Sequence, residues 1–306
     1  MEQQTIKNNK HSLDGIFLLD KPTNMTSNQA LQVVKRLFNA RKAGHTGSLD
    51  PLASGVLPIC FGQATKFSQY LLEANKHYRV IGKLGVVTTT GDMEGEILEN
   101  KNIEEISVSQ IEKALLKFKG VIEQIPSMYS AIKYNGQPLY KLARQGITID
   151  RKPRVLTVFK LELIKYAEGL LELDVICSKG TYIRTLIEDI GKELKCGAHV
   201  VSLRRLGAGV YSETQSWSLP KLEMQLMNTE QKRLEELLLP IASIFNDWQE
   251  VLLSEAAIYY LRQGQAVIVP YSPTSGDVRL LTKNGQFLGI GRILDDGKVA
   301  PIRLIF

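Results

Sequence analysis

Residues 41–67, RKAGHTGSLDPLASGVLPICFGQATKF, are the stretch of this sequence that decides its fold. The first part, residues 41–55, contains four Gly or Pro residues, which disfavour a helix and let the backbone turn tightly or approach another group closely. An apolar run, residues 56–61, follows directly. We therefore predict a shaped loop between a preceding helix and this apolar run.

The surrounding chain alternates between strand and helix patterns. Apolar and alternating runs predict strands at residues 15–20, 78–85 and 171–177. Apolar side chains at helical spacing predict three helices. Ser27 can cap the first and Thr181 the last, whereas the second begins at Ser109 and is stopped by Gly120. The last of these helices is expected to carry Tyr182 and Arg184 in its first turn, a usual place for functional side chains.

The last sixty or so residues have a different character. Asn-Gly at 284–285 and Asp-Gly at 296–297 are strong hairpin signals, and each separates two runs of strand-forming residues. The predicted strands are residues 278–282, 286–293 and 299–305, and a helical stretch around residues 254–263 precedes them. We predict a small β meander, joined to the rest of the chain by residues 215–247.

Composition narrows the class of protein. The 306 residues suffice for one large and one small domain, and the net charge of +6 weakly favours a polyanionic partner. Cys60, Cys177 and Cys196 lie far apart without a C-x-x-C pair, which is typical of reduced, mostly buried thiols in a cytosolic protein. No signal peptide and no apolar run near the ~20 residues of a membrane span are present, so we expect a cytoplasmic protein without a membrane partner.

Most familiar catalytic motifs are missing from the sequence. The histidines at 11, 45, 77 and 199 lack metal-binding spacing, and no cysteine lies close enough to complete a local zinc site. The sequence has no phosphate-binding P-loop, no dinucleotide fingerprint and no G-x-S-x-G elbow. We therefore expect no metal and no cofactor. What remains is Asp50, a carboxylate between glycines that is followed by Pro51.

An Asp-Pro pair by itself is more often a plain turn than a catalytic site. Three further motifs change that balance: KHYRV at residues 76–80, SKGTYIR at residues 178–184 and LRRL at residues 203–206. In this order and over this length, the chain resembles the TruB family, the bacterial tRNA pseudouridine-55 synthases. The resemblance runs from residue 15 to about residue 213 and resumes in the C-terminal meander.

The resemblance implies a mixed α/β (α+β) fold with a largely antiparallel central sheet, followed by a small PUA domain, a β-barrel-like RNA-binding module. The implied divisions are a mobile tail at residues 1–12, a catalytic domain at 13–247 with an RNA-binding insert at about 124–154, and the PUA-like domain at 248–306. It also implies that Asp50 is the catalytic aspartate, Tyr78 the tyrosine against the target base and Arg184 the partner of the aspartate. The residues that would line the RNA and uracil site, or lie beside it, are His45, Tyr182, Leu203, Lys21 and Asp92. One departure is Thr89, where the family often has Asp.

The implied reaction gives these residues physical tasks. Uridine becomes pseudouridine when the bond from N1 to C1′ breaks and the uracil rejoins through C5. Asp50 must be ionised either to attack the sugar or to remove a sugar proton, and the sequence leaves both routes open. A pocket would raise the pKa of Asp50, and the guanidinium of Arg184 would oppose that rise. A stacked uridine must also be flipped out, at a cost of a few kcal/mol, and His45 is a candidate wedge for the gap. The plain alternatives are a solvated arginine in a first helical turn and a packed core tyrosine at Tyr78.

Residues 124–154 interleave aromatic and basic side chains in a second candidate RNA contact. Aromatic rings can stack on bases, and basic groups can follow the phosphates. The candidates are Tyr129, Lys133, Arg144, Arg151 and Arg154. A solvated basic hairpin or helix face is the alternative that composition leaves open.

The function that the resemblance implies is isomerisation of uridine 55 in the T stem-loop of tRNA, and we expect a monomer that needs no guide RNA. Two alternatives are a non-catalytic tRNA-binding or folding protein on the same scaffold, and a dyskerin-type synthase that depends on a guide RNA. The basic insert favours a stand-alone enzyme, because the dyskerin type largely lacks it.

Overall fold

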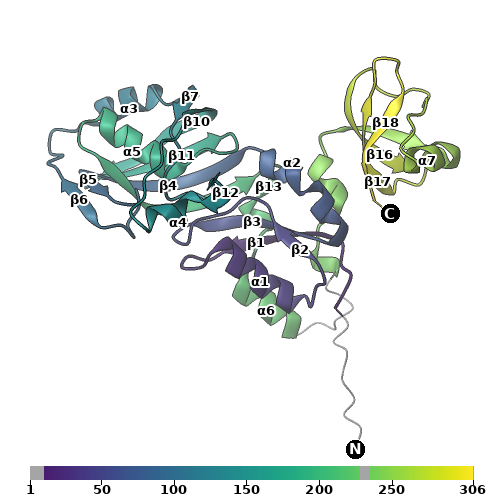
Figure 1. Ribbon diagram of the computed structural model, residues 1–306, viewed down its shortest axis with the longest axis horizontal. Coiled ribbons are helices and arrows are strands. Elements are labelled where there is room, and N and C mark those ends of the chain that lie inside the picture. Colours follow the sequence, from purple (N-terminus) through teal and green to yellow (C-terminus); the bar gives the residue numbers. More distant parts are fainter. Residues whose placement is uncertain (1–9, 228–234, 306) are drawn as a thin grey trace, which may run out of the picture.

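The computed structural model describes residues 10–227 and 235–305. Figure 1 shows a main body built around one large sheet and a C-terminal part with its own sheet. Residues 1–9 of the predicted tail lie outside the described residues. His11, also assigned to that tail, is held in place, because its backbone N–H donates to the carbonyl of Asn39 at 2.8 Å.

The main body is organised by a ten-stranded sheet. Its strands are β1 (Gly15–Lys21), β2 (Ala43–His45), β3 (Ser54–Phe61), β4 (Lys76–Leu84), β7 (Gly120–Gln124), β10 (Arg154–Ala167), β11 (Leu170–Cys177), β12 (Ala198–Ala208), β13 (Tyr211–Ser212) and β14 (Trp217–Ser218). They lie in the order β14-β1-β3-β12-β4-β11-β10-β7, with β2 on β3 and β13 on β12. Only the β14–β1 and β3–β12 pairs are parallel, which confirms the largely antiparallel sheet.

Helices and short hairpins surround this sheet (Figure 1). The helices are α1 (Ser27–Leu37), α2 (Ser68–Glu73), α3 (Val108–Leu116), α4 (Leu139–Ala143), α5 (Ile183–Glu193) and α6 (Leu219–Met227), with 3-10 turns η1 (Gly62–Phe67), η2 (Glu213–Gln215) and η4 (Ile241–Phe245). The hairpins are β5 (Val86–Thr88) with β6 (Ile97–Asn100), and β8 (Lys133–Tyr134) with β9 (Gln137–Pro138). Within the described residues, no helix is long and apolar enough to cross a bilayer.

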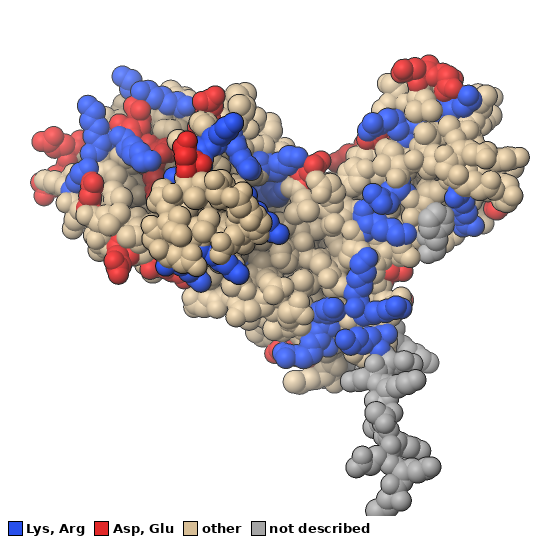
Figure 2. Space-filling model, in the orientation of Figure 1, with Lys and Arg blue, Asp and Glu red and all other residues tan. Residues whose placement is uncertain are grey.

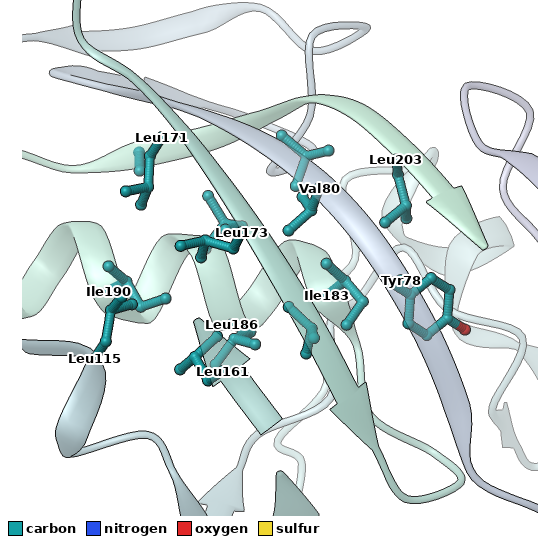
Figure 3. Close-up of a cluster of buried hydrophobic side chains, with 14 of the residues drawn as sticks. Tyr78, Val80, Leu115, Leu161, Leu171, Leu173, Ile183, Leu186, Ile190 and Leu203 are labelled. Atoms are coloured by element: carbon teal, nitrogen blue, oxygen red, sulfur yellow. The ribbon is translucent and has the colours of Figure 1, made fainter. Parts of the chain in front are cut away.

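Two hydrophobic clusters attach the main helices to the sheet. Helix α1 buries Ala30, Leu31 and Val34 in a cluster with side chains of β1 and β3. Helix α5 packs against β12, β4 and β11 through Ile183, Leu186, Ile187 and Ile190, and α3 adds Ile111 and Leu115 to the same cluster. Figure 3 shows Tyr78 at one end of this second cluster, with its hydroxyl pointing away from the other labelled side chains.

The predicted cap of α1 is wrong by one residue. The cap is Thr26, whose hydroxyl accepts the backbone N–H of Gln29 at 3.2 Å in a reciprocal capping box. Ser27 is the first helical residue, and its buried hydroxyl binds the backbone of Leu49 instead. A contact across the fold therefore takes the hydroxyl that the local pattern assigns to the cap.

The starts of the other two predicted helices also shift. Helix α3, predicted to begin at Ser109, begins at Val108, and Ser107 caps it by accepting the backbone N–H of Gln110. The cap position of α5 is Tyr182, not Thr181, because the Thr181 hydroxyl turns back and donates to the carbonyl of Ser178 at 3.0 Å. Arg184 nevertheless lies in the first turn of α5, as expected.

The expected loop at residues 41–55 contains a short strand. β2 pairs with β3 in a register that sets Ala43 opposite Phe61 and His45 opposite Ile59. Three residues are too few to show the alternation of a strand, and the glycine in the middle reads as a loop residue. His45 is therefore held on a sheet edge rather than on a free loop.

The C-terminal part forms a separate four-stranded sheet. Its elements are β15 (Gln249–Leu253), α7 (Glu255–Arg262), β16 (Gly276–Thr282), β17 (Phe287–Ile293) and β18 (Val299–Leu304). The structure confirms the three predicted strands and the helix, and it adds β15, which pairs in parallel with β16. The order β15-β16-β17-β18 is open, since β15 and β18 are not paired among residues 235–305. The barrel closure implied by the PUA resemblance is thus not seen there, and the PUA assignment stays a prediction.

Candidate active site

Arg184 joins three segments that are far apart in the sequence. Its Nε lies 3.0 Å from Asp50 Oδ2 and its Nη1 lies 3.2 Å from Asp92 Oδ2. Nη1 also donates to the carbonyl of Thr90 at 3.0 Å, and Nη2 donates to the carbonyl of Tyr129 at 2.8 Å. The side chains of Arg184 and Asp92 are 6% and 4% exposed, whereas that of Asp50 is 40% exposed. The arginine thus holds one buried carboxylate behind it and one carboxylate that faces solvent.

The Asp92 carboxylate is fixed by its own turn. Its Oδ1 accepts the Thr90 hydroxyl at 2.5 Å and the backbone N–H of Glu94 at 3.2 Å. Thr89, the departure from the family pattern, is exposed, and its hydroxyl accepts the backbone N–H of Glu96. The departure therefore leaves the contacts between Asp92 and the arginine intact.

The electrostatic balance at Asp50 has opposing parts. Burial raises the pKa of this carboxyl group most, Arg184 lowers it, Asp92 raises it and Lys21 lowers it, and the net direction is upward. The Asp50 side chain is 40% exposed, which limits how far burial raises this pKa. The arginine favours the ionised form, as expected, without fully offsetting the surroundings.

Tyr78 lies on β4, beside Leu203 on β12. Both side chains belong to the cluster under α5, and both are almost fully buried, at 9% and 6% exposed. The same cluster contains Leu49 and Leu52, which flank the Asp50–Pro51 pair. Burial raises the pKa of the Tyr78 phenol, and Arg205 opposes the rise. The phenol thus lies at the border between the apolar core and the charged residues.

His45 reaches the same region from β2. Its half-buried side chain has a pKa below the usual histidine value, because of burial first and the charge of Arg205 second. Nδ1 is buried and has no hydrogen-bond partner among the described residues. A neutral imidazole nitrogen without a partner keeps the capacity to accept or donate one hydrogen bond.

Lys21 is fully buried at the end of β1. Its ammonium group donates to the carbonyls of Pro22 at 2.8 Å and Met25 at 2.6 Å. Burial lowers the pKa of Lys21 to about 8, and the charge of Asp50 opposes that shift. Lys21 therefore holds a turn and places a positive charge near Asp50.

The insert residues divide into two groups. Tyr129 is half-buried and touches Arg184 through its carbonyl, and Arg151 donates to the carbonyl of Pro126 at 2.9 Å within the insert itself. Lys133 and Arg144 are exposed. Two more predicted residues border the site. The backbone of Tyr182 forms two hydrogen bonds with the side-chain amide of Gln124. Arg154 is exposed, and its charge lowers the pKa of the Tyr182 phenol, although burial raises that pKa by more.

Arg205 is a central residue that the sequence reasoning missed. It is 1% exposed, donates from Nε to the carbonyl of Val56 at 2.7 Å and from Nη2 to the carbonyl of Gly47 at 3.1 Å, and pairs with Tyr78 in the β12–β4 register. No carboxylate forms an ion pair with it among the described residues. The signal was available in LRRL, because alternate residues of a strand face opposite sides and one of two adjacent arginines must point inward. Arg204 takes the outer side and binds Asp20.

The described residues contain no group of three His, Cys, Asp or Glu side chains arranged to hold a metal ion. The site instead combines one accessible carboxylate, the arginine that holds it, a buried phenol and a neutral imidazole. Such a set can perform proton transfer or nucleophilic attack beside a flat, partly apolar ligand.

Comparisons with known proteins agree along the whole chain. Residues 35–183 match the TruB family pseudouridylate synthase N-terminal domain, residues 184–246 match the tRNA pseudouridylate synthase B C-terminal domain, and residues 250–305 match the C-terminal domain described as Pseudouridine synthase II TruB. The tRNA pseudouridine synthase B of Coxiella burnetii strain RSA 493 is 55% identical over 296 residues, which cover 97% of this chain and 96% of the relative. That of Ectopseudomonas mendocina is 51% identical over 301 residues, 98% of each chain.

A solved structure shares the fold. A chain of the Cbf5-Nop10-Gar1 complex matches 97% of this chain and 85% of its own length, with a TM-score of 0.73 and 24% sequence identity. The fold, the arginine-held carboxylate and these likenesses together define a pseudouridine synthase. More narrowly, the chain belongs to the TruB family of pseudouridylate synthases.

Proposed function

We propose that the protein isomerises uridine 55 in the T loop of tRNA to pseudouridine, with Asp50 as the reacting carboxylate. The contact of Arg184 Nε with Asp50 Oδ2 at 3.0 Å carries this proposal, because it holds an accessible carboxylate in one orientation. Relatives named tRNA pseudouridine synthase B, at 50–55% identity over nearly the full chain, support the substrate class.

The reaction needs the carboxylate ionised and pointed at the sugar. In one route Asp50 attacks C1′ as N1 leaves, and in the other it removes a sugar proton to expel the uracil; the uracil then turns and C5 bonds to C1′. Arg184 favours the ionised carboxyl group, and buried Asp92 keeps the guanidinium in place from the other side. The reaction consumes no oxidant and releases no product fragment.

Tyr78, Leu203 and His45 would receive the flipped uridine. The Tyr78 phenol lies at the edge of an apolar cluster, where a ring can support the uracil and a hydroxyl can reach the proton that leaves C5. His45 lies half-buried on β2 and would contact the displaced nucleotide or the strand that it leaves.

Further residues would bind the RNA outside the uridine pocket. The exposed Lys133, Arg144 and Arg154 would follow phosphates of the T stem, with Tyr129, Tyr182 and Lys21 nearer the base. Figure 2 shows a group of Lys and Arg side chains low on the main body and another on the C-terminal part, an arrangement suited to a polyanion. We infer a catalytic domain at residues 13–247, a PUA-like RNA-binding domain at 248–306, action as a monomer without guide RNA, and a cytoplasmic location in which the three buried thiols stay reduced.

The two alternatives have less support. A non-catalytic tRNA-binding protein would have no need for an accessible carboxylate held by a buried arginine. The guide-RNA alternative draws on the Cbf5 complexes, but their chains are below 25% identical and share only the fold.

A tritium-release assay tests the proposed function. The substrate is tRNA with tritium at uracil C5, and we expect the wild type to release tritium as C5 bonds to the sugar. Asp50→Asn should lose at least about 1,000-fold in rate while still binding tRNA. Asp247→Asn, an equal charge change at an exposed position, is the matched control and should retain the wild-type rate. No release by the wild type would contradict the proposal.

A further inference from the structure

We propose that Ser27 is a positioning residue for Asp50, acting through the backbone of Leu49. The inference rests on the proposed function of Asp50. Asp50 lies on the segment between β2 and β3, so its orientation toward Arg184 depends on how the backbone of that segment is held.

The Ser27 hydroxyl binds both polar backbone groups of a single residue. Its Oγ accepts the Leu49 N–H at 2.7 Å and donates to the Leu49 carbonyl at 3.1 Å. Ser27 is 4% exposed and Leu49 is 6% exposed, so neither backbone group has easy access to water. One hydroxyl can make both bonds at once, because it has one hydrogen to donate and lone pairs to accept.

A second contact holds the chain on the other side of Asp50. The backbone N–H of Asn24 donates to the carbonyl of Pro51 at 2.8 Å. Lys21 stabilises the turn that presents Asn24, since its ammonium group binds the carbonyls of Pro22 and Met25. Ser27 and Asn24 therefore hold the backbone immediately before and immediately after the carboxylate.

The contact between Ser27 and Leu49 affects the position of the Asp50 segment more than the stability of helix α1. Thr26, the adjacent hydroxyl residue, caps α1 through its capping box with Gln29 and forms no hydrogen bond with residues 49–51. Ser27 forms no capping bond and contacts Leu49, 22 positions away along the chain. Two neighbouring hydroxyls thus have separate tasks, which provides a matched pair of variants.

Removal of the Ser27 hydroxyl leaves the Leu49 N–H and carbonyl buried without partners. The segment must then shift to reach water or another partner, and Asp50 moves with it. A misplacement of about 1 Å in a reacting group can reduce the rate about 100-fold without weakening substrate binding.

The test compares Ser27→Ala with Thr26→Ala in the full-length protein. Single-turnover tritium release from C5-labelled tRNA should fall about 30- to 100-fold in Ser27→Ala, while its Kd for tRNA stays within about twofold of the wild type. Thr26→Ala should keep its rate within about threefold, although loss of the cap lowers its Tm. The acid limb of the pH–rate profile should also move to higher pH in Ser27→Ala, because a displaced Asp50 loses part of the effect of Arg184 that lowers its pKa.

Each outcome has a distinct meaning. Equal rates for Ser27→Ala and Thr26→Ala, or a weaker Kd with an unchanged rate, would overturn the positioning role while leaving the proposed function standing. A wild type that releases no tritium would overturn the proposed function and this inference with it. If Ser27→Ala does not fold, Ser27→Cys keeps nearly the same volume with weaker hydrogen bonds, and it should show an intermediate rate at wild-type Kd.

Discussion

At the scale of single residues, Arg184 is the centre of the site because every one of its nitrogens has a partner. Nε meets Asp50, Nη1 meets Asp92 and the carbonyl of Thr90, and Nη2 meets the carbonyl of Tyr129. A planar guanidinium with fixed contacts on three sides cannot rotate freely, and a lysine could not replace its geometry. The consequence is an Asp50 carboxylate whose orientation is set from behind while its open side faces solvent.

Asp92→Asn tests this balance through its pH dependence. The negative charge of Asp92 raises the pKa of Asp50, so its removal should lower that pKa and move the acid limb of the pH–rate profile to lower pH. The rate at neutral pH should fall about tenfold, equivalent to about 1.4 kcal/mol, because Arg184 loses one of the groups that orient it. The measurement is single-turnover tritium release across the pH range in which both proteins stay folded. Asp189→Asn is the control, because Asp189 lies on the same helix as Arg184 but pairs with Lys192 at the surface, and it should leave the profile unchanged. An acid limb that moves to higher pH in Asp92→Asn would contradict this role of Asp92.

The sequence allowed prediction of some of these residues and not others. Asp50 and Arg184 sit in long, multi-part motifs, and the structure places them in contact, as the resemblance implied. Arg205 escaped notice because its importance comes from burial beside Tyr78 and Gly47, contacts that depend on the pairing of β12 with β4 and β3. Local pattern could show that one arginine of LRRL faces inward, but not what it would meet.

At the scale of elements, the hydrophobic patterns predicted where the strands lie but not which residue caps each helix. The strands β1, β4 and β11 fall within one or two residues of their predicted ranges. The cap of α1 shifted because two hydroxyl residues stand together at the start of that helix, and a contact with Leu49 decides which of them caps it. Information of that kind is tertiary and is absent from any short window of sequence.

The insert at residues 124–154 yields a prediction at this scale. Lys133 and Arg144 are exposed, so Lys133→Ala and Arg144→Ala should each reduce the slope of log K against log salt for tRNA binding by about 1. Arg151→Ala should change the slope less and make the insert easier to cleave with protease, because its guanidinium holds the carbonyls of Pro126 and Ile149. Lys165→Ala, exposed on β10 outside the insert, serves as the control. An unchanged slope in both Lys133→Ala and Arg144→Ala would remove the insert from the phosphate-binding surface.

At the scale of the whole molecule, an aromatic cluster joins the main body to the C-terminal part. Phe245 is 1% exposed, and its ring lies 5.7 Å from that of Phe67, 5.1 Å from Tyr70, 4.8 Å from Trp248 and 6.0 Å from Phe287. Phe67 and Tyr70 come from the segment around α2, whereas Phe287 comes from β17 of the C-terminal sheet. The two parts are therefore coupled by packing rather than by a bare linker.

Phe245→Ala should weaken this coupling. We expect the free energy of unfolding to fall by about 3–5 kcal/mol, since a large aromatic ring leaves a cavity between the parts. Urea denaturation measures the loss, and separate transitions for the two parts would accompany it. Phe159→Ala removes a ring that is 51% exposed and should cost far less; equal losses in the two variants would show that the cluster does not couple the parts.

In the proposed reaction Asp50, held by Arg184, acts on a uridine flipped out of the tRNA T loop. The most direct measurement is a crystal structure of the protein with a T-arm hairpin that carries 5-fluorouridine at the target position. We expect a flipped nucleotide with its sugar against the Asp50 carboxylate and its base on the ring of Tyr78. A target nucleotide that stays stacked in the loop, or that binds away from Asp50, would contradict it.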